Sequence, residues 1–364
     1  MTLTEPDAGP RTVDAVAGRV FETVVASTEA LAMALGHRLG WYSALAGGEP
    51  TTAGELAEAT ATDQRYCREW LEQQAVSGML DVVPGEAPAD ERRFVMPSAV
   101  AEVMTDVDSL AYLAPLARMV ATAGRDYELV TAAARSGGGV SWETHGADMR
   151  EAQAEGNRAA FLALMPEWLA SMPDVVERLR ARGARIADVG CGFGWSSVGM
   201  ARAFGGVRVD CFDVDAESVV AARAIAEREG VADRMTVSQE DVGTRPPGQR
   251  YDLVTAFECI HDMPDPVGVM AAMREMAGDD GTVMVMDERA AEEFTAPGDA
   301  LERWLYGVSL FICLPDGLSA PGSVGTGTAM RPSVLRRYAH AAGFSGLEVL
   351  DVDHDFFRFY RLLR

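Results

Sequence analysis

Three glycines at alternate positions mark the stretch of this chain that is best suited to bind a ligand. Gly190, Gly192 and Gly194 follow a short apolar run and precede a helical pattern. Glycine lets the backbone approach a ligand closely, and the helix offers backbone N–H groups at its N-terminus. The next apolar run ends in Asp213, and an acid about 20 residues beyond such a loop can bind a ribose hydroxyl. These residues predict a nucleotide pocket. The dinucleotide fingerprint G-x-G-x-x-G is excluded, because Trp195 stands where its third glycine belongs.

The elements that must position this loop form an alternating pattern. From about residue 182 onward, apolar runs typical of strands alternate with helical patterns, and this rhythm predicts a Rossmann-like α/β fold with a parallel sheet. Residues 289–333 interrupt the rhythm with an amphipathic helix and a loop rich in Gly, Pro and Ser. The interruption follows the carboxyl end of a strand, where ligands bind in open α/β sheets. We expect it to act as a lid.

The N-terminal region has a different pattern. We expect a disordered tail at 1–15, a winged-helix domain at 16–110, and a helical connector at 111–181 that contributes to a substrate cavity. Thr51 or Thr52 with Glu55 predicts a helix start inside the winged helix. Residues 1–100 carry 15 acids and 7 arginines, whereas a DNA-recognition helix needs a basic footprint. A dimerisation module is therefore favoured over a DNA-binding domain.

Composition limits the partners and the compartment. The net charge is −23 over 364 residues, and such an acidic chain repels nucleic acids and anionic membranes. The five cysteines show no C-x-x-C spacing, which fits reduced thiols in a cytosol. We expect neither a signal peptide nor a membrane span, because no basic segment precedes an apolar core at the N-terminus and no stretch of about 18 apolar residues occurs. We expect a cytoplasmic protein that acts on a small molecule.

The glycine pattern resembles a known family. The sequence D-x-G-x-G-x-G, from Asp188 to Gly194, resembles motif I of the class I S-adenosylmethionine (SAM) methyltransferases. The resemblance implies SAM as the cofactor and S-adenosylhomocysteine as the product, in a domain that spans 182–364. It also implies that Asp241 accepts a hydrogen bond from the adenine amino group, while the N–H of Val242 meets the ring. The expected cofactor-binding residues are Asp188, Gly190, Gly192, Gly194, Asp213, Asp241, Val242 and Glu258.

A second motif resembles a narrower group. The segment His261-Asp262-Met263-Pro264-Asp265 resembles the H-D-W-x-D segment of plant-type small-molecule O-methyltransferases, which also carry an N-terminal winged-helix dimerisation domain. The resemblance implies a homodimer, with His261 as the general base for an acceptor hydroxyl and Asp287 as the carboxylate that orients it. Segments such as ECIHDMPDPV and GTGTAMRP more closely resemble a group of actinobacterial winged-helix methyltransferases.

The chain departs from the plant-type pattern in ways that leave alternatives open. Met263 replaces the tryptophan, and no acid stands near Ala329 or Met330, where a second orienting glutamate belongs. Some bacterial C-methyltransferases bind a metal through the same His-Asp pair and a further His, but Ile312 and Cys313 occupy the matching stretch. Cys313 could serve as a zinc ligand there, but without a further His we expect no metal. Methylation of carbon or nitrogen, a non-methylating SAM enzyme and a SAM-sensing DNA-binding regulator remain as alternatives.

Overall fold

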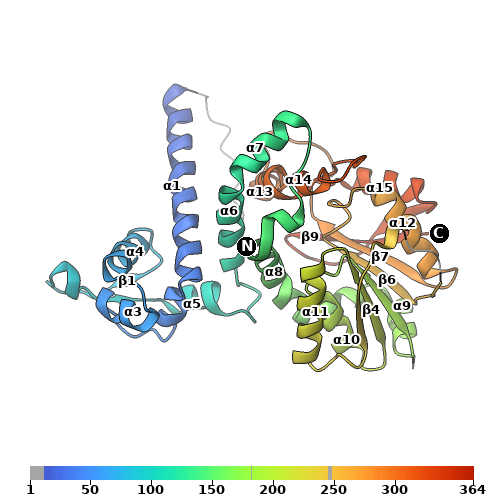
Figure 1. Cartoon of the computed structure of the whole chain (residues 1–364), viewed down its shortest axis with the longest axis horizontal. Helices are drawn as coiled ribbons and strands as arrows, with labels where there is room; N and C mark the ends of the chain where they lie inside the picture. Colours follow the sequence, from blue (N-terminus) through green and yellow to red (C-terminus); the bar gives the residue numbers. More distant parts are fainter. Residues whose placement is uncertain (1–11, 182, 245–247) are drawn as a thin grey trace. The chain divides into compact units, whose positions relative to one another are not determined.

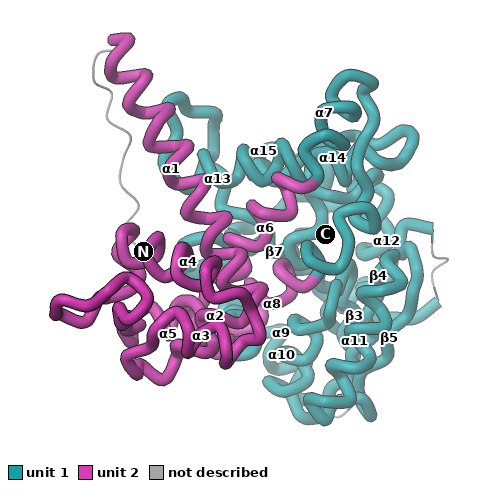
Figure 2. Tube along the Cα trace, turned by 60° about the vertical axis from the view of Figure 1, so that its left-hand side comes forward, with its two compact units in different colours: residues 1–8, 126–150, 160–364 teal, residues 9–125, 151–159 magenta. Residues whose placement is uncertain are grey.

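A computed structural model describes residues 12–181, 183–244 and 248–364. The chain divides into two compact units, coloured separately in Figure 2. Among the described residues, unit 1 contains Asp126–Arg150 and Ala160–Arg364, and unit 2 contains the chain up to Arg125 together with Glu151–Ala159. The long helix α8 (Trp142–Ala170) therefore contributes to both.

A mixed sheet of seven strands organises unit 1 (Figure 1). The strands are β3 (Arg185–Val189), β4 (Arg208–Asp213), β5 (Met235–Gln239), β6 (Leu253–Phe257), β7 (Thr282–Glu288), β8 (Gly346–Val349) and β9 (Phe357–Leu363). Their order is β5-β4-β3-β6-β7-β9-β8. The first five run parallel, as the alternating pattern predicted, whereas β9 is antiparallel to both β7 and β8. The short connection between β8 and β9 allows only an antiparallel hairpin, because a parallel crossover needs a dozen or more residues.

The strand order places the carboxyl ends of β4 and β6, the two neighbours of β3, beside the glycine loop that follows β3. The chain reverses its direction of winding between β3 and β6, and ligands of open α/β sheets bind at such a switch point. The central strands are almost fully buried, which is typical of a parallel sheet covered on both faces. Helices of this unit are α7 (Tyr127–Ser136), α8 (Trp142–Ala170), α9 (Pro173–Leu179), α10 (Trp195–Ala203), α11 (Ala216–Arg228), η2 (Val242–Thr244), α12 (Pro266–Ala277) and α15 (Pro332–Ala341).

The predicted insertion at 289–333 is only partly an α-helix. It holds α13 (Ala300–Val308), a π-helical turn η3 (Ser309–Cys313) and α14 (Leu314–Gly317), followed by the glycine-rich loop. The apolar periodicity predicted one continuous amphipathic helix here. The π-helical turn was not predictable from it, since the same residues fit either hydrogen-bonding pattern.

Unit 2 contains the winged helix. Its elements are α1 (Val13–Arg38), α2 (Trp41–Leu45), α3 (Ala53–Thr60), α4 (Gln64–Val76), β1 (Asp81–Val82), η1 (Ala89–Glu91), β2 (Phe94–Val95), α5 (Ser98–Thr105) and α6 (Ala114–Arg125). The two short strands pair antiparallel as the wing. Thr52, not Thr51, caps α3, since its hydroxyl accepts from the N–H of Glu55 and the Glu55 carboxylate accepts from the N–H of Thr52. Trp41, Trp70 and Phe94 lie in the buried core of this unit.

Two predicted boundaries differ from the structure. Residues 13–15 belong to α1, whereas residues 1–11 of the expected tail lie outside the described residues. The expected connector at 111–181 is not one piece, because α6 packs along α1 in unit 2 while α7 and α9 belong to unit 1. The reason is the apolar stripe of α6, where Ala117 and Met119 are buried. Sequence periodicity shows that a helix has such a stripe but not which helix covers it.

Within the described residues, no single helix has both the length and the apolar character needed to cross a membrane. The helices α8 and α9 satisfy this requirement only as a pair, by length and composition alone, and the chain bends by 112° between them.

Candidate active site

The glycine loop connects β3 to α10. All three glycines have left-handed backbones, with φ of 67° at Gly190, 53° at Gly192 and 79° at Gly194. L-residues with a side chain rarely adopt this conformation, so the loop depends on glycine at each position. Gly194 is also the N-cap of α10. The loop therefore turns the backbone sharply from the end of β3 into a helix N-terminus.

The three glycines face different surroundings. A Cβ on Gly190 would lie 2.7 Å from Sγ of Cys259, and one on Gly194 would lie 2.7 Å from Cε of Met235. A Cβ on Gly192 would meet no atom of the described residues within 4 Å. Gly190 and Gly194 thus serve close packing, whereas Gly192 borders open space where a ligand can approach the backbone.

Asp213, the last residue of β4, is hydrogen-bonded to this loop. Its Oδ2 accepts a hydrogen bond from the N–H of Gly192 at 2.7 Å, and its Oδ1 accepts from the N–H of Asp215 at 2.9 Å. Burial raises the pKa of Asp213 above its usual value. A carboxylate has about four lone-pair sites, so it keeps capacity for a hydroxyl donor.

Asp188 lies at the beginning of the loop but is enclosed by protein. Its side chain accepts hydrogen bonds from the hydroxyls of Ser196 at 2.5 Å, Ser197 at 2.6 Å and Thr255 at 2.8 Å. Its exposed fraction is 1%, and burial raises the pKa of the carboxyl. Asp188 therefore joins β3 to α10 and β6. In this geometry it holds the loop through side-chain hydroxyls rather than presenting a carboxylate to a ligand.

The remaining predicted cofactor residues follow neighbouring strands. Asp241 is exposed beyond β5, where its Oδ1 accepts from the N–H of Gly243 at 2.9 Å, and Val242 is buried. The N–H of Glu240 donates to the carbonyl of Asp213 at 2.9 Å, which brings this segment beside the end of β4. Glu258 follows β6 with a left-handed φ of 50°, a rare conformation for a residue with a side chain.

Sequence reasoning missed one ion pair at this end of the sheet. Arg150 of α8 donates two hydrogen bonds to Asp215, at 2.8 Å from Nε and 2.6 Å from Nη2. Asp215 also caps α11, through a hydrogen bond from the N–H of Ser218. The two side chains are 7% and 10% exposed. Arg150 had no signal in the sequence, because it lies 65 positions away from its partner.

His261 occupies the loop after β6, where three carboxylates surround its ring. Nδ1 lies 2.9 Å from Asp287 and 3.1 Å from Glu288, and Nε2 lies 3.0 Å from Asp262. Burial alone would lower the pKa of His261, but the charges of Asp262, Glu288 and Asp287 outweigh it and raise the pKa well above its usual value. The structure thus brings together His261 and Asp287, as the sequence predicted, and adds two acids to them.

Asp262 does not cap a helix, although Asp is a common N-cap residue and α12 begins shortly after it. The N-cap of α12 is Asp265, whose Oδ1 accepts from the N–H of Gly268 at 2.9 Å. Asp262 is therefore free of a capping role and faces His261 instead.

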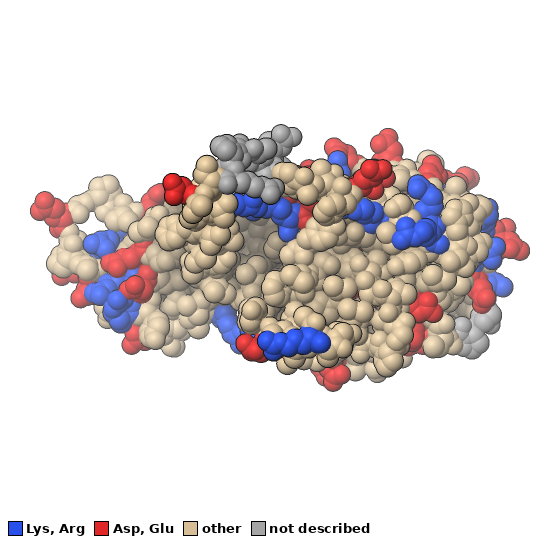
Figure 3. All heavy atoms as spheres, turned by 90° about the horizontal axis from the view of Figure 1, so that it is seen from above, with Lys and Arg blue, Asp and Glu red and all other residues tan. Residues whose placement is uncertain are grey.

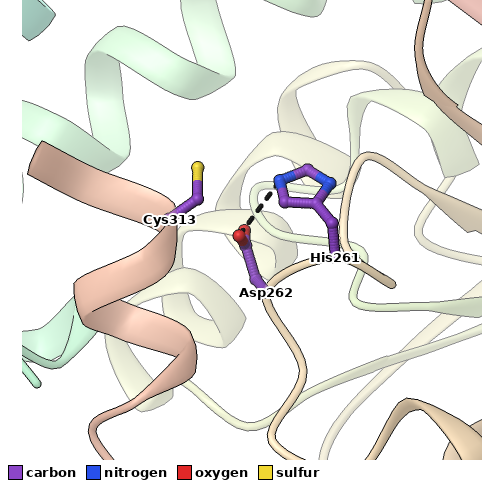
Figure 4. A group of neighbouring side chains, drawn as sticks. All are labelled: His261, Asp262 and Cys313. Atoms are coloured by element: carbon purple, nitrogen blue, oxygen red, sulfur yellow. Dashed lines mark ion pairs between the residues drawn. The ribbon is translucent and has the colours of Figure 1, made fainter. Parts of the chain in front are cut away.

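The second half of the insertion also reaches His261. The N–H of Gly327 donates to the carbonyl of His261 at 3.1 Å, and a Cβ on Gly317 would lie 3.2 Å from the carbonyl of Asp262. These contacts place Cys313 beside His261 and Asp262 (Figure 4). Burial raises the pKa of Cys313 to about 12. One turn further on, burial and then the charge of Asp262 raise the pKa of Asp316 to about 7.

Comparison with known proteins agrees with both parts of this architecture. Residues 187–283 match the family model described as a methyltransferase domain, and residues 27–106 match the Rv2258c-like winged HTH domain. The ubiquinone biosynthesis O-methyltransferase of Xanthomonas euvesicatoria is 37% identical over 120 residues, which cover 33% of this chain and 48% of that protein. The protein with the same name from Bordetella bronchiseptica is 39% identical over 102 residues, covering 28% of this chain and 41% of that protein. The chain thus spans about half the length of these curated relatives or less.

Solved structures resemble the chain over nearly its whole length. The mitomycin 7-O-methyltransferase has a TM-score of 0.73 at 21% identity, covering 96% of this chain and 98% of that chain. Human N-acetylserotonin methyltransferase, solved with SAM, has a TM-score of 0.71 at 14% identity, covering 99% of each chain. Identities this low establish a shared fold. The chain therefore joins a winged helix-turn-helix domain to a domain with the Rossmann-like methyltransferase fold.

Proposed function

We propose that the protein is a SAM-dependent methyltransferase that acts on a small organic acceptor. The observation that carries this proposal is the left-handed glycine loop with open space at Gly192 and the Asp213 carboxylate hydrogen-bonded to it. The matched methyltransferase domain and the relatives named as O-methyltransferases support the same function. SAM would supply a methyl group on a sulfonium sulfur.

The described residues fit such a cofactor. Asp213 has lone pairs for ribose hydroxyls, and the bare backbone at Gly192 leaves room for a ligand in van der Waals contact. Asp241 and Val242 follow the neighbouring strand, in a position to meet an adenine ring. The contribution of Asp188 is to fix the loop, and Glu258 stands at the end of β6, towards the acceptor side.

The acceptor is proposed to be a hydroxyl oxygen, in line with the names of the relatives. Catalysis would come mainly from alignment of that oxygen with the methyl group in a site from which water is excluded. The insertion at 289–333 would close the site. Asp287 orients His261 through Nδ1. In this arrangement His261 is a poor general base, because both ring nitrogens face carboxylates and this favours a proton on each.

Calorimetry with S-adenosylhomocysteine tests the cofactor. We expect binding of S-adenosylhomocysteine and none of NAD. Asp213→Asn should weaken the binding at least tenfold, since it replaces a charged acceptor of hydroxyls by an amide (about 1.5–3 kcal/mol). Asp210→Asn is the matched control, because Asp210 lies on the same strand but contacts Arg185 and Tyr251 instead. Uptake of NAD alone would overturn the proposal.

Product mass then separates methyl transfer from other chemistry. Incubation of the protein with SAM and a panel of phenols and hydroxy acids should give a product heavier by one methyl group, together with S-adenosylhomocysteine. Release of a product without that gain in mass would favour a non-methylating enzyme.

We further propose that the protein forms a homodimer through unit 2. The long helix α1 exposes an apolar stripe with helical spacing, which includes Val13, Val16, Val20, Phe21, Val24, Leu31 and Leu35. Stripes of this kind are typical of helix–helix interfaces. Light scattering should give twice the chain mass, and Phe21→Glu, which places a charge at a residue 70% exposed, should give the monomer.

The alternative of a DNA-binding regulator receives little support from unit 2. Four arginines of its winged helix are matched by acids, in the pairs Arg65–Glu69, Arg68–Asp90, Arg92–Glu72 and Arg93–Glu55. On the face shown in Figure 3, the basic and acidic side chains of the described residues are interspersed. A recognition helix with its cations neutralised lacks the electrostatic term that dominates binding to phosphates.

A further inference from the structure

The surroundings of His261 hold more negative charge than the imidazole can balance. Asp287 is 1% exposed, Glu288 12% and Asp262 25%, measured on the side chains. Within the described chain, Oδ1 of Asp262, Oδ2 of Asp287 and Oε2 of Glu288 are buried atoms that accept no well-directed hydrogen bond. Buried carboxylate oxygens in this condition are costly unless a cation or a proton compensates them.

We propose that His261, Asp262 and Cys313 bind one divalent transition-metal ion. Each side chain offers one ligand atom, namely Nε2, a carboxylate oxygen and Sγ, and these atoms all lie within 4.8 Å of one another. Ligand atoms about 2.0–2.3 Å from a tetrahedral Zn²⁺ lie about 3.3–3.8 Å from one another, so atoms within 4.8 Å of one another are near the spacing that one ion needs. The nitrogen and oxygen atoms are already 3.0 Å apart, so a small movement of Cys313 would complete the set.

The fold holds the sulfur ligand in place. Cys313 is the last residue of the π-helical turn η3, a rare conformation that occurs frequently at functional sites. The hydrogen bond from Gly327 to the His261 carbonyl and the close approach of Gly317 to Asp262 fix the insertion against the loop after β6. Figure 4 shows Cys313 projecting from its helix beside the other two ligands.

The contact between Nδ1 of His261 and Asp287 also suits a metal ligand. Asp287 lies 2.9 Å from Nδ1, and a carboxylate at Nδ1 fixes the tautomer whose Nε2 lone pair is available for a metal. On the other side of the ring, Oδ1 of Asp262 lies 3.0 Å from Nε2, so that one ion can contact both atoms.

The ligand types indicate the class of metal. A set of one imidazole, one carboxylate and one thiolate suits Zn²⁺, Fe²⁺ or Co²⁺, whereas Mg²⁺ and Ca²⁺ prefer oxygen alone. Three protein ligands leave at least one coordination position open, as in catalytic zinc sites. An oxygen of the acceptor could bind there, which would orient it without a basic histidine.

Titration of the chelator-treated protein with Co²⁺ tests the site. We expect one ion per chain and a sulfur-to-cobalt charge-transfer band in the near ultraviolet. Cys313→Ser should abolish the band, and Asp262→Asn should weaken binding at least tenfold. Cys67→Ser is the matched control, because Cys67 is also buried but lies in unit 2, and this variant should keep the band.

Two outcomes would overturn the metal site: the absence of stoichiometric Co²⁺ binding, or a charge-transfer band that survives in Cys313→Ser. Calorimetry with S-adenosylhomocysteine on the same samples keeps this result separate from the cofactor proposal. Loss of cofactor binding would contradict the proposed function, whereas cofactor binding without cobalt binding would contradict only the metal site. Asp262 is partly exposed, so Asp262→Asn provides a test even if Cys313→Ser folds poorly.

Discussion

Substitution of Gly192 by alanine separates the packing of the glycine loop from its contact with a ligand. The added Cβ meets no atom of the described residues within 4 Å, so only the left-handed φ of 53° strains the folded protein. That strain costs about 1–2 kcal/mol, which corresponds to a fall in melting temperature of about 2–8 °C for a unit of this size. The fold should therefore survive.

The effect on the ligand should be larger than the effect on stability. If a cofactor packs against the bare backbone, the new methyl group overpacks that contact by about 1–3 kcal/mol, a loss of affinity of about 5- to 140-fold. Calorimetry with S-adenosylhomocysteine measures it.

Gly230→Ala supplies the matched control. Gly230 has a φ of 69° and the same free space, but it follows α11 and lies outside the loop. It should lose comparable stability while keeping its affinity. Equal affinities in the two variants, within about twofold, would refute the reasoning, because they would show that no ligand contacts Gly192.

Three further perturbations test the described contacts. Thr52→Ala should lower the free energy of unfolding by about 1 kcal/mol in chemical denaturation, and the same change at the preceding threonine, which does not cap α3, should have a smaller effect. Arg150→Met should cost about 3–5 kcal/mol because it leaves the Asp215 carboxylate buried without its cation, and a second change, Asp215→Ser, should restore part of the loss. If Asp215→Ser restored none of the stability that Arg150→Met had lost, this explanation would be contradicted. The hydrogen bond from Arg361 lowers the pKa of Asp174 to about 2, so this carboxylate stabilises the fold above its unfolded pKa of about 3.9 and ceases to do so as the pH falls towards 2. In urea unfolding, Asp174→Asn should therefore be less stable than the wild type at pH 7, with a difference that shrinks between pH 4 and 2; a constant difference would contradict the assignment.

The local features of the fold were predictable from the sequence. The glycine spacing and the alternating apolar runs predicted the Rossmann-like sheet, and both the fold and the match to a methyltransferase domain confirm it. The capping pattern of Thr52 and Glu55 was equally accessible, since both halves of it lie within one helical turn.

The surroundings of His261 show where such reasoning ends. Asp287 was expected only from the resemblance to the plant-type O-methyltransferases, and it lies beside His261 because the carboxyl ends of neighbouring parallel strands meet at one edge. The contacts of Asp262 and Glu288 with His261 were not predicted, since they depend on how the loop after β6 and the end of β7 are placed in space. Cys313 lies 52 positions beyond His261, and its approach depends on a π-helical turn that periodicity does not show.

The sequence alone thus determined which elements form, how they alternate and where the glycine loop stands, because these properties follow from backbone conformation and apolar spacing within short segments. Only the tertiary structure decided that Arg150 pairs with Asp215, that α6 packs on α1 and that Cys313 stands beside His261. Contacts between distant segments depend on the packing of whole elements, and no short-range pattern encodes them.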